Sequence, residues 1–270
     1  EVKTIEKPWG EWFSLDELEA ALIEHKPAIL AMVHAETSTG VCQPMEGIGD
    51  LCRKHDCLLL LDTVTSLGGV PLYIDEWKVD LAYSCSQKGL SCPPGLGPFT
   101  MGPRAEAKMT ARQGKVPNWY LDVSLLNQYW GSDRVYHHTA PVNMNFGMRE
   151  ALRLLAEEGL DQAWARHRSN AEMLWNGLES LGLSMHVPAE RRLPTLTTVR
   201  IPEGVDGKAF SQHLLNNHGI EVGGGLGSLA GKIWRIGLMG YNSTPENVNR
   251  LLNLFETELP RFSGSVAAAA

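Results

Sequence analysis

The 270-residue sequence contains no CxxC pair, although it has five cysteines. An odd number of cysteines without metal-type or disulfide-type spacing is typical of a protein in a reducing compartment. Basic residues are also in deficit, with 24 Lys and Arg against 31 Asp and Glu, so the formal net charge is −7. A surface of this sign gives no reason to expect nucleic acid or an anionic membrane as a partner.

Long apolar runs and targeting signals are absent as well. No uninterrupted apolar stretch reaches the roughly 18 residues that a membrane span needs. The first residues carry no signal-peptide pattern and no initiator methionine, so we expect the chain to start within a longer protein. The final residues show no peroxisomal Ser-Lys-Leu address, which favours the cytoplasm over the peroxisome. Residues 264–270, which end in four alanines, are treated as a tail outside the fold.

Short apolar runs and helical patterns alternate in the first half of the chain. The spacing of Ser14 and Glu17 is that of a capping box, which predicts a helix that begins at Leu15 and ends before Pro27. A second helix is predicted over residues 45–55. Three apolar runs predict buried strands at 28–33, 57–62 and 79–84. This alternation predicts an α/β fold with a mostly parallel sheet covered by helices.

The second half has a different pattern, typical of a smaller α+β domain. Helices are predicted at 143–158, 161–181 and 206–218 and from Thr244, and strands at 195–201 and 231–239. We place the boundary near Leu160. The prediction is a large domain over 1–159 and a small C-terminal domain over 160–263.

Polar clusters follow each predicted strand of the first half. They are Glu36–Gly40, Asp62–Thr65 and Ser86–Lys88. Because ligands bind at the carboxyl ends of strands in α/β sheets, we expect these clusters to lie together around one site. We assign no role to His34, which precedes the first cluster.

Lys88 and Asp62 are the most informative residues of these clusters. A lysine at a strand end can form a Schiff base with an aldehyde cofactor, and a nearby carboxylate can hold a pyridinium nitrogen protonated. The pair therefore indicates pyridoxal phosphate chemistry. Two simpler interpretations stay open: Lys88 as a solvated surface lysine, and Asp62 as the N-cap of a helix from Thr63.

Three further features have competing interpretations. Arg235 lies in an apolar run, where it either binds a substrate carboxylate in bidentate fashion or forms an internal ion pair. The glycines at 223–227 match no phosphate-loop pattern and indicate a closely packed or flexible turn. His137 and His138 should point to opposite faces of an extended chain, so we predict no metal site there.

Six stretches, in this order, match one known family: ETSTGV (36–41), LLDTVTSLGG (60–69), SCSQKG (84–89), YHHTAP (136–141), LPTLTTV (193–199) and WRIGLMG (234–240). On these motifs the chain resembles the alanine–glyoxylate and serine–glyoxylate aminotransferases, which are class V, fold-type I pyridoxal phosphate enzymes. The motifs span nearly all of the chain, and their combination is specific.

The resemblance implies a role for each matching residue around pyridoxal 5'-phosphate. Lys88 would bind the cofactor covalently and shuttle the substrate proton, and Asp62 would bind the pyridine nitrogen. Val64 would pack on the ring face. Thr37 would lie near the ring substituents and Gln87 near the phosphate.

The same resemblance implies an active site shared across a homodimer. Tyr136 and Thr139 would reach the phosphate of the cofactor in the neighbouring subunit. Arg235 would bind the substrate carboxylate. The implied substrates are a small amino acid and a 2-oxo acid, with alanine or serine as donor and glyoxylate as acceptor.

The chain departs from the family pattern at its N-terminal end. A whole enzyme of this kind has on the order of a hundred residues before the position of Glu1, in keeping with ordinary domain sizes. These include a phosphate-binding loop and a tryptophan that stacks on the cofactor, whose place neither Trp9 nor Trp12 takes. We therefore expect an N-terminal segment, or another chain, to complete the cofactor site.

Two alternative functions stay open from the sequence. The chain could be a cysteine desulfurase-like pyridoxal phosphate enzyme, with Cys92 as the reactive cysteine, although Pro93 and Pro94 make that loop stiff. It could also be a non-catalytic subunit or fragment of such an enzyme.

Overall fold

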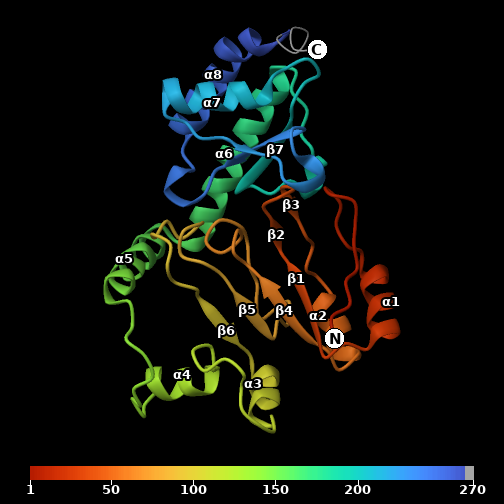
Figure 1. Ribbon diagram of the computed structural model, residues 1–270, viewed down its shortest axis with the longest axis vertical. Coiled ribbons are helices and arrows are strands. Elements are labelled where there is room, and N and C mark those ends of the chain that lie inside the picture. The colour runs from red at the N-terminus through yellow and green to blue at the C-terminus, as the bar shows by residue number, and fades with distance from the viewer. Residues whose placement is uncertain (265–270) are drawn as a thin grey trace.

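The first half of the chain forms a four-stranded sheet in the computed structural model, which describes residues 1–264. Strands β1 (Ile29–Val33), β4 (Leu58–Asp62), β5 (Leu81–Tyr83) and β6 (Phe99–Met101) lie in the order β1-β4-β5-β6. The pairs β1–β4 and β4–β5 are parallel, and β6 joins β5 antiparallel. The predicted, mostly parallel sheet is thus confirmed (Figure 1).

Helices α1 (Leu15–His25) and α2 (Ile48–Lys54) pack on this sheet. The predicted capping box is present, since the Ser14 hydroxyl and the Glu17 carboxylate each accept the backbone N–H of the other residue. Leu18 and Leu22 of α1 are buried in the hydrophobic cluster that includes Leu59 and Leu61 of β4. Burial of such leucine side chains contributes about 1.5–3 kcal/mol each, which fixes the helix layer on the sheet.

The prediction of a buried strand was wrong for β1. Ile29 and Val33 are 47% and 36% exposed, and exposure alternates along the strand. Only Leu30 and Met32, on the other face, contact the core cluster. The physical reason is position: β1 is an edge strand in the described sheet, so its apolar residues have neighbours on one side only.

Several short elements were not predicted. These are β2 (Ala35–Glu36), β3 (Val41–Cys42), β6, α3 (Pro103–Thr110), α4 (Val123–Trp130) and β8 (Gly223–Gly224), with 3-10 turns at Ala189–Arg191, Gly227–Leu229, Gly240–Asn242 and Leu259–Phe262. Strands β2 and β3 form a two-residue antiparallel pair directly after β1. Helix α4 has no buried residue. Figure 1 shows it below β6 beside α3, whereas α5 (Val142–Glu158) lies apart from it, near the start of α6 (Leu160–Ser180).

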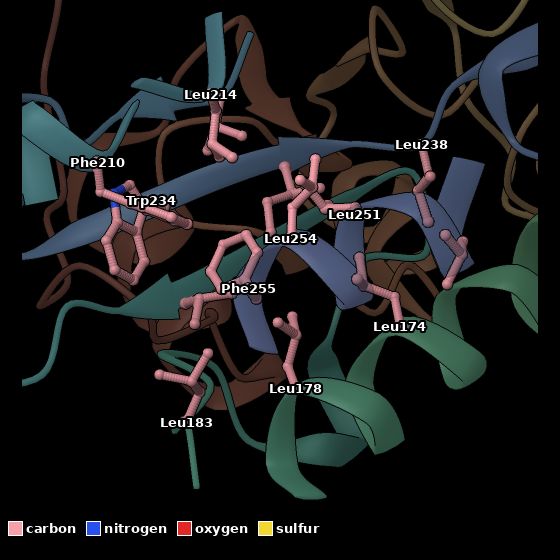
Figure 2. Packing of buried hydrophobic residues seen from close by; sticks show 14 residues of the cluster. Leu174, Leu178, Leu183, Phe210, Leu214, Trp234, Leu238, Leu251, Leu254 and Phe255 are labelled. Atoms are coloured by element: carbon pink, nitrogen blue, oxygen red, sulfur yellow. The ribbon is translucent and has the colours of Figure 1, made fainter. Parts of the chain in front are cut away.

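The second half builds its own sheet and core. Strand β9 (Ile233–Gly237) lies between β7 (Leu196–Arg200) and β8, and both pairings are antiparallel. Helices α6 (Leu160–Ser180), α7 (Gly207–His218) and α8 (Pro245–Glu258) cover it. Figure 2 shows Phe255 of α8 between Trp234 of β9 and Leu178 of α6. This core is separate from the one under the first sheet. Among the described residues, no helix has both the length and the apolar character to span a bilayer.

Candidate functional site

The loops that follow β1, β4 and β5 begin at one edge of the first sheet. The backbone N–H of His34, just past β1, donates to the Asp62 carbonyl at 3.0 Å. The backbone N–H of Thr63, just past β4, donates to the Tyr83 carbonyl at 2.9 Å. These bonds continue the sheet ladder one residue beyond the strands. They bring together the starts of the three polar clusters that the sequence predicts.

Asp62 is half-buried and held by two hydrogen bonds. Its Oδ1 accepts from the Val64 backbone N–H at 2.8 Å, and its Oδ2 accepts from the Tyr83 hydroxyl at 2.6 Å. The residues from Val64 onward form turns, so Asp62 caps a turn and the helix N-cap interpretation is wrong. A carboxylate fixed in this way keeps one orientation for a ligand at the sheet edge.

Tyr83 is a residue that sequence reasoning missed. It lies directly opposite Asp62 in the parallel register of β4 and β5. The hydrogen bond to Asp62 raises the pKa of Tyr83 to about 12, with smaller effects of burial and of the carboxylate charge. Aligning the two predicted strands by their ends would have shown this pairing.

Lys88 lies in the loop after β5, half-buried, and within residues 1–264 its amine has no hydrogen-bond or ion-pair partner. The next residue must be glycine, because a Cβ on Gly89 would lie 2.3 Å from the Leu67 carbonyl oxygen. This close approach joins the Lys88 loop to the Asp62 loop. A half-buried amine without a partner fits a nucleophile better than a solvated surface lysine.

Arg235 of β9 reaches the first loop from the small domain. Its Nη1 donates to the Thr37 carbonyl at 3.3 Å, and its Nε donates to the Gly224 carbonyl at 2.7 Å. No carboxylate partner of Arg235 is found among the described residues, so the internal ion-pair interpretation is wrong. The two bonds use two of the five guanidinium N–H groups and leave the others for a ligand.

The small domain bonds to all three loops. Besides the Arg235 contact, the Thr198 hydroxyl donates to the Thr39 carbonyl at 2.8 Å, and the Thr195 hydroxyl donates to the Thr65 carbonyl at 3.0 Å. The Tyr241 backbone N–H donates to the Ser91 hydroxyl at 2.8 Å. These interdomain contacts close the site from the side of β7 and β9.

Two predicted site residues lie elsewhere in the chain. Tyr136 and Thr139 bond to each other at 3.0 Å in the loop between α4 and α5, and Tyr136 is 71% exposed. Within residues 1–264 no hydrogen bond joins either of them to the Lys88 loop. The neighbouring His137 and His138 turn their Nδ1 atoms toward each other, 2.8 Å apart, so the predicted opposite orientation was wrong. In the described residues no third ligand joins them.

The glycine-rich turn and His34 behave as packing elements. A Cβ on Gly225 would lie 1.9 Å from the Leu229 carbonyl oxygen, which confirms the closely packed turn. His34 is buried against the Trp77 ring, and this burial lowers its pKa to about 4. Its imidazole is therefore neutral at physiological pH.

These features define the class of the protein. The sequence profile of the class-V aminotransferases matches residues 1–251, and the chain belongs to that family. Its fold is that of the fold-type I pyridoxal phosphate enzymes, as solved structures of high similarity show.

Particular relatives carry more specific names. The chain is 47% identical to the alanine–glyoxylate aminotransferase of Oryctolagus cuniculus over 90% of its own length and 63% of the relative. It superimposes with a TM-score of 0.93 on an alanine–glyoxylate aminotransferase from Nostoc sp., at 65% identity, covering 94% of this chain and 67% of that one. A ureidoglycine–glyoxylate aminotransferase from Bacillus subtilis gives a TM-score of 0.93 at 40% identity, with 96% and 67% covered. The chain thus spans about three fifths of the length of its curated relatives.

Proposed function

We propose that this chain is the catalytic part of a transaminase that moves an amino group from alanine, or serine, to glyoxylate. The observation that carries the proposal is a free Lys88 amine in the loop beside the fixed Asp62 carboxylate. The similar alanine–glyoxylate and ureidoglycine–glyoxylate aminotransferases support glyoxylate as acceptor.

The Lys88 amine and the Asp62 carboxylate fit pyridoxal 5'-phosphate. Lys88 offers the amine that an aldehyde needs, and Asp62 offers an immobile carboxylate at the adjoining strand end. When bound, the cofactor supplies an electron sink for cleavage of a bond at the substrate Cα. We propose that Val64 packs against its ring, and that Thr37 and Gln87 lie near its substituents and phosphate, respectively.

The remaining chemistry belongs to the protein's own groups. The Asp62 carboxylate accepts a hydrogen bond from a protonated ring nitrogen and keeps that proton in place, because an opposite charge nearby favours the protonated form. The Lys88 amine would take the proton from the substrate Cα and deliver it to the carbon that carried the cofactor's aldehyde, because a proton returned to Cα would leave the amino group where it was. The Arg235 guanidinium binds the substrate carboxylate with its remaining N–H groups.

A donor and acceptor panel with the full-length protein tests the proposal. Pyruvate formation from alanine plus glyoxylate, or hydroxypyruvate formation from serine plus glyoxylate, is expected. Sulfide release from cysteine would instead indicate a desulfurase. The burial of Cys92 disfavours that outcome, because a reactive thiol needs access to the substrate. No turnover with any pair, in a protein of confirmed full length, would point to a non-catalytic subunit.

We expect Arg235→Lys to raise the KM for the amino donor by about 10–100-fold, with a smaller effect on kcat. The basis is the loss of a charge-assisted bidentate contact, worth about 1.5–3 kcal/mol. Steady-state kinetics with varied donor measure this change. Arg200→Lys, at the exposed end of β7, is the matched control and should leave KM unchanged. An unchanged KM in Arg235→Lys removes this arginine from substrate binding.

We further propose a homodimer in which Tyr136 and Thr139 reach the partner's cofactor phosphate. The support is a group of exposed large apolar side chains on α4, α5 and their flanks, namely Trp119, Tyr120, Leu121, Trp130, Val135, Tyr136, Val142, Phe146, Leu152 and Leu154. Large exposed apolar patches mark protein interfaces, and α4 buries no residue within its own chain.

Phe146→Glu is therefore expected to weaken the dimer, because it places a charge in an apolar contact. Sedimentation or light scattering of the full-length protein measures the change in mass. Leu226→Glu is the control, because Leu226 is another exposed apolar residue and lies outside this group. A dimer that resists Phe146→Glu places the interface elsewhere.

Two smaller proposals complete the assignment. We place the domain division near Leu160, where α6 begins, and the two separate hydrophobic cores support it. We also propose a cytoplasmic location, for which the five free cysteines are the support, since disulfides are rare in that compartment.

A further inference from the structure

Two histidines and a glutamate meet at one end of the small domain, away from the proposed active site. His213 and His218 lie in the last turns of α7, and Glu258 is the last residue of α8. Figure 1 shows α7 and α8 beside each other at the top of the molecule. The ligand atoms of the three side chains all lie within 4.8 Å of one another.

The geometry is close to what a transition-metal ion needs. The His213 Nε2 lies 2.9 Å from the Glu258 Oε2, and the His213 and His218 ring centroids are 5.3 Å apart. In a tetrahedral zinc site with bonds of about 2.0–2.2 Å, ligand atoms lie about 3.3–3.5 Å apart. The three ligand atoms lie within 4.8 Å of one another, so side-chain rotation has to bring the imidazole of His218 inward to complete three protein ligands.

The surroundings also suit a metal rather than a simple ion pair. The side chains of His213 and Glu258 are only 19% and 12% exposed, so a carboxylate is held in a poorly solvated position opposite two imidazoles. Imidazole nitrogen with carboxylate oxygen is a donor set that zinc accepts, and a fourth position is left for water.

Asn217 can hold His213 in the form that binds a metal. Its side-chain amide lies 3.0 Å from the His213 Nδ1. A half-turn of the carboxamide presents Oδ1 as an acceptor for the Nδ1–H, which leaves Nε2 free as a ligand. Metal-binding histidines usually have such a partner on the second ring nitrogen.

Arg261 opposes metal binding. Its Nη1 donates to the Glu258 Oε2 at 2.7 Å and thus competes for the carboxylate. Its side chain is 66% exposed, so it can move into solvent at low cost. This competition gives the site a distinctive signature, because removal of a non-ligand should improve binding.

We propose that His213, His218 and Glu258 form a binding site for a divalent transition-metal ion, best suited to Zn²⁺, that joins the end of α7 to the end of α8. The bound ion would link the two helices across a sequence separation of 45 residues, between His213 and Glu258. It would act by stabilising the small domain, independently of the proposed transaminase activity.

Calorimetric titration of the full-length holoenzyme with Zn²⁺, without amino acid substrate, tests the site. One ion per chain is expected to bind, and an excess of 100 times the Kd should raise the Tm of the small-domain transition by roughly 10–20 °C. Co²⁺ titration should give the visible bands of a low-coordinate site. These readouts do not require transaminase turnover.

Two variants are expected to weaken Zn²⁺ binding, and a third is expected to strengthen it. Removal of a residue that only supports a metal ligand costs about 10–100-fold in metal affinity. His213→Ala and Glu258→Gln each remove a ligand itself, so each should weaken Zn²⁺ binding by more than that. Arg261→Ala should strengthen it by about 2–5-fold. The matched control is His55→Ala, because His55 pairs with Glu19 at 3.2 Å but has no second imidazole beside it.

Three results would overturn the proposal. One is the absence of Zn²⁺ binding in the unmodified protein. Another is binding that His213→Ala and His55→Ala weaken equally, because this would show that the ion contacts surface histidines in general. Weaker binding in Arg261→Ala would also contradict it, since Arg261 would then support the ion instead of competing with it.

Discussion

Lys88→Ala is expected to abolish the visible absorption of the cofactor-bound protein and to lower turnover by about 10⁴-fold or more. General acid–base transfer by a positioned side chain contributes about 10²–10⁴-fold, and the covalent link to the aldehyde is lost with the same amine. Spectroscopy and single-turnover kinetics on the full-length protein measure the two effects separately. The structure supports this size of effect, because the amine has no structural partner among residues 1–264 whose loss would complicate the result.

The control for this substitution is Lys108→Ala on the exposed face of α3. It removes one positive charge of the same type without touching the site, so both readouts should stay unchanged. If the Lys88→Ala protein keeps a covalently bound aldehyde, another amine is the nucleophile, and the role of Lys88 must be withdrawn.

Asp62→Asn is expected to reduce turnover by about 10²–10³-fold, the usual cost of removing one preorganised electrostatic partner. The change keeps the size of the side chain but removes the negative charge that would hold a pyridine nitrogen protonated. The same charge acts on Tyr83, whose pKa is raised to about 12 chiefly by its hydrogen bond to Asp62. Without the carboxylate, this pKa should fall toward the ordinary value of about 10.

Ultraviolet titration of tyrosinate measures this second effect without any cofactor. The sign is fixed: at pH 11, Tyr83 is mostly protonated in the parent protein and should be mostly ionised in Asp62→Asn. The control is Tyr83→Phe, which identifies the signal and should cost turnover less than Asp62→Asn, because the carboxylate remains. Normal turnover in Asp62→Asn would falsify its proposed role, whereas an unchanged Tyr83 titration would show only that the hydrogen bond survives the substitution.

Much of the fold could be predicted because local signals agreed with the final packing. The helix after Ser14, the helices that start after Asp206 and Thr244, and the strands around Leu59 and Trp234 all have caps or apolar patterns that match their burial. The exposure of β1 could not be predicted, since its apolar run is the same whether a strand is central or at an edge. Strand β8, made of Gly223 and Gly224, contradicts propensity and exists only because β9 pairs with it.

The candidate site was predictable to the extent that it follows strand ends. Asp62 ends one apolar run and Lys88 lies in the loop after another, and the parallel pattern puts such positions at one edge. The contact between Arg235 and Thr37 joins residues 198 positions apart, and no local pattern specifies it. The cluster of His213, His218 and Glu258 was not predicted from the sequence for the same reason, because only the packing of α8 against α7 brings the glutamate to the histidines.

The interdomain hydrogen bonds at the site have a consequence for how the protein moves. Each loop of the site is tied to Thr195, to β7, to β9 or to the turn after β9, and such bonds contribute about 0.5–1.5 kcal/mol each. A hinge opening of the small domain would break these four bonds together, at a cost of roughly 2–6 kcal/mol, and would also break the bond from the Leu193 N–H to the Gly40 carbonyl. Open forms would then be rare, and substrate entry and product release would proceed through local side-chain motion more often than through rotation of a whole domain.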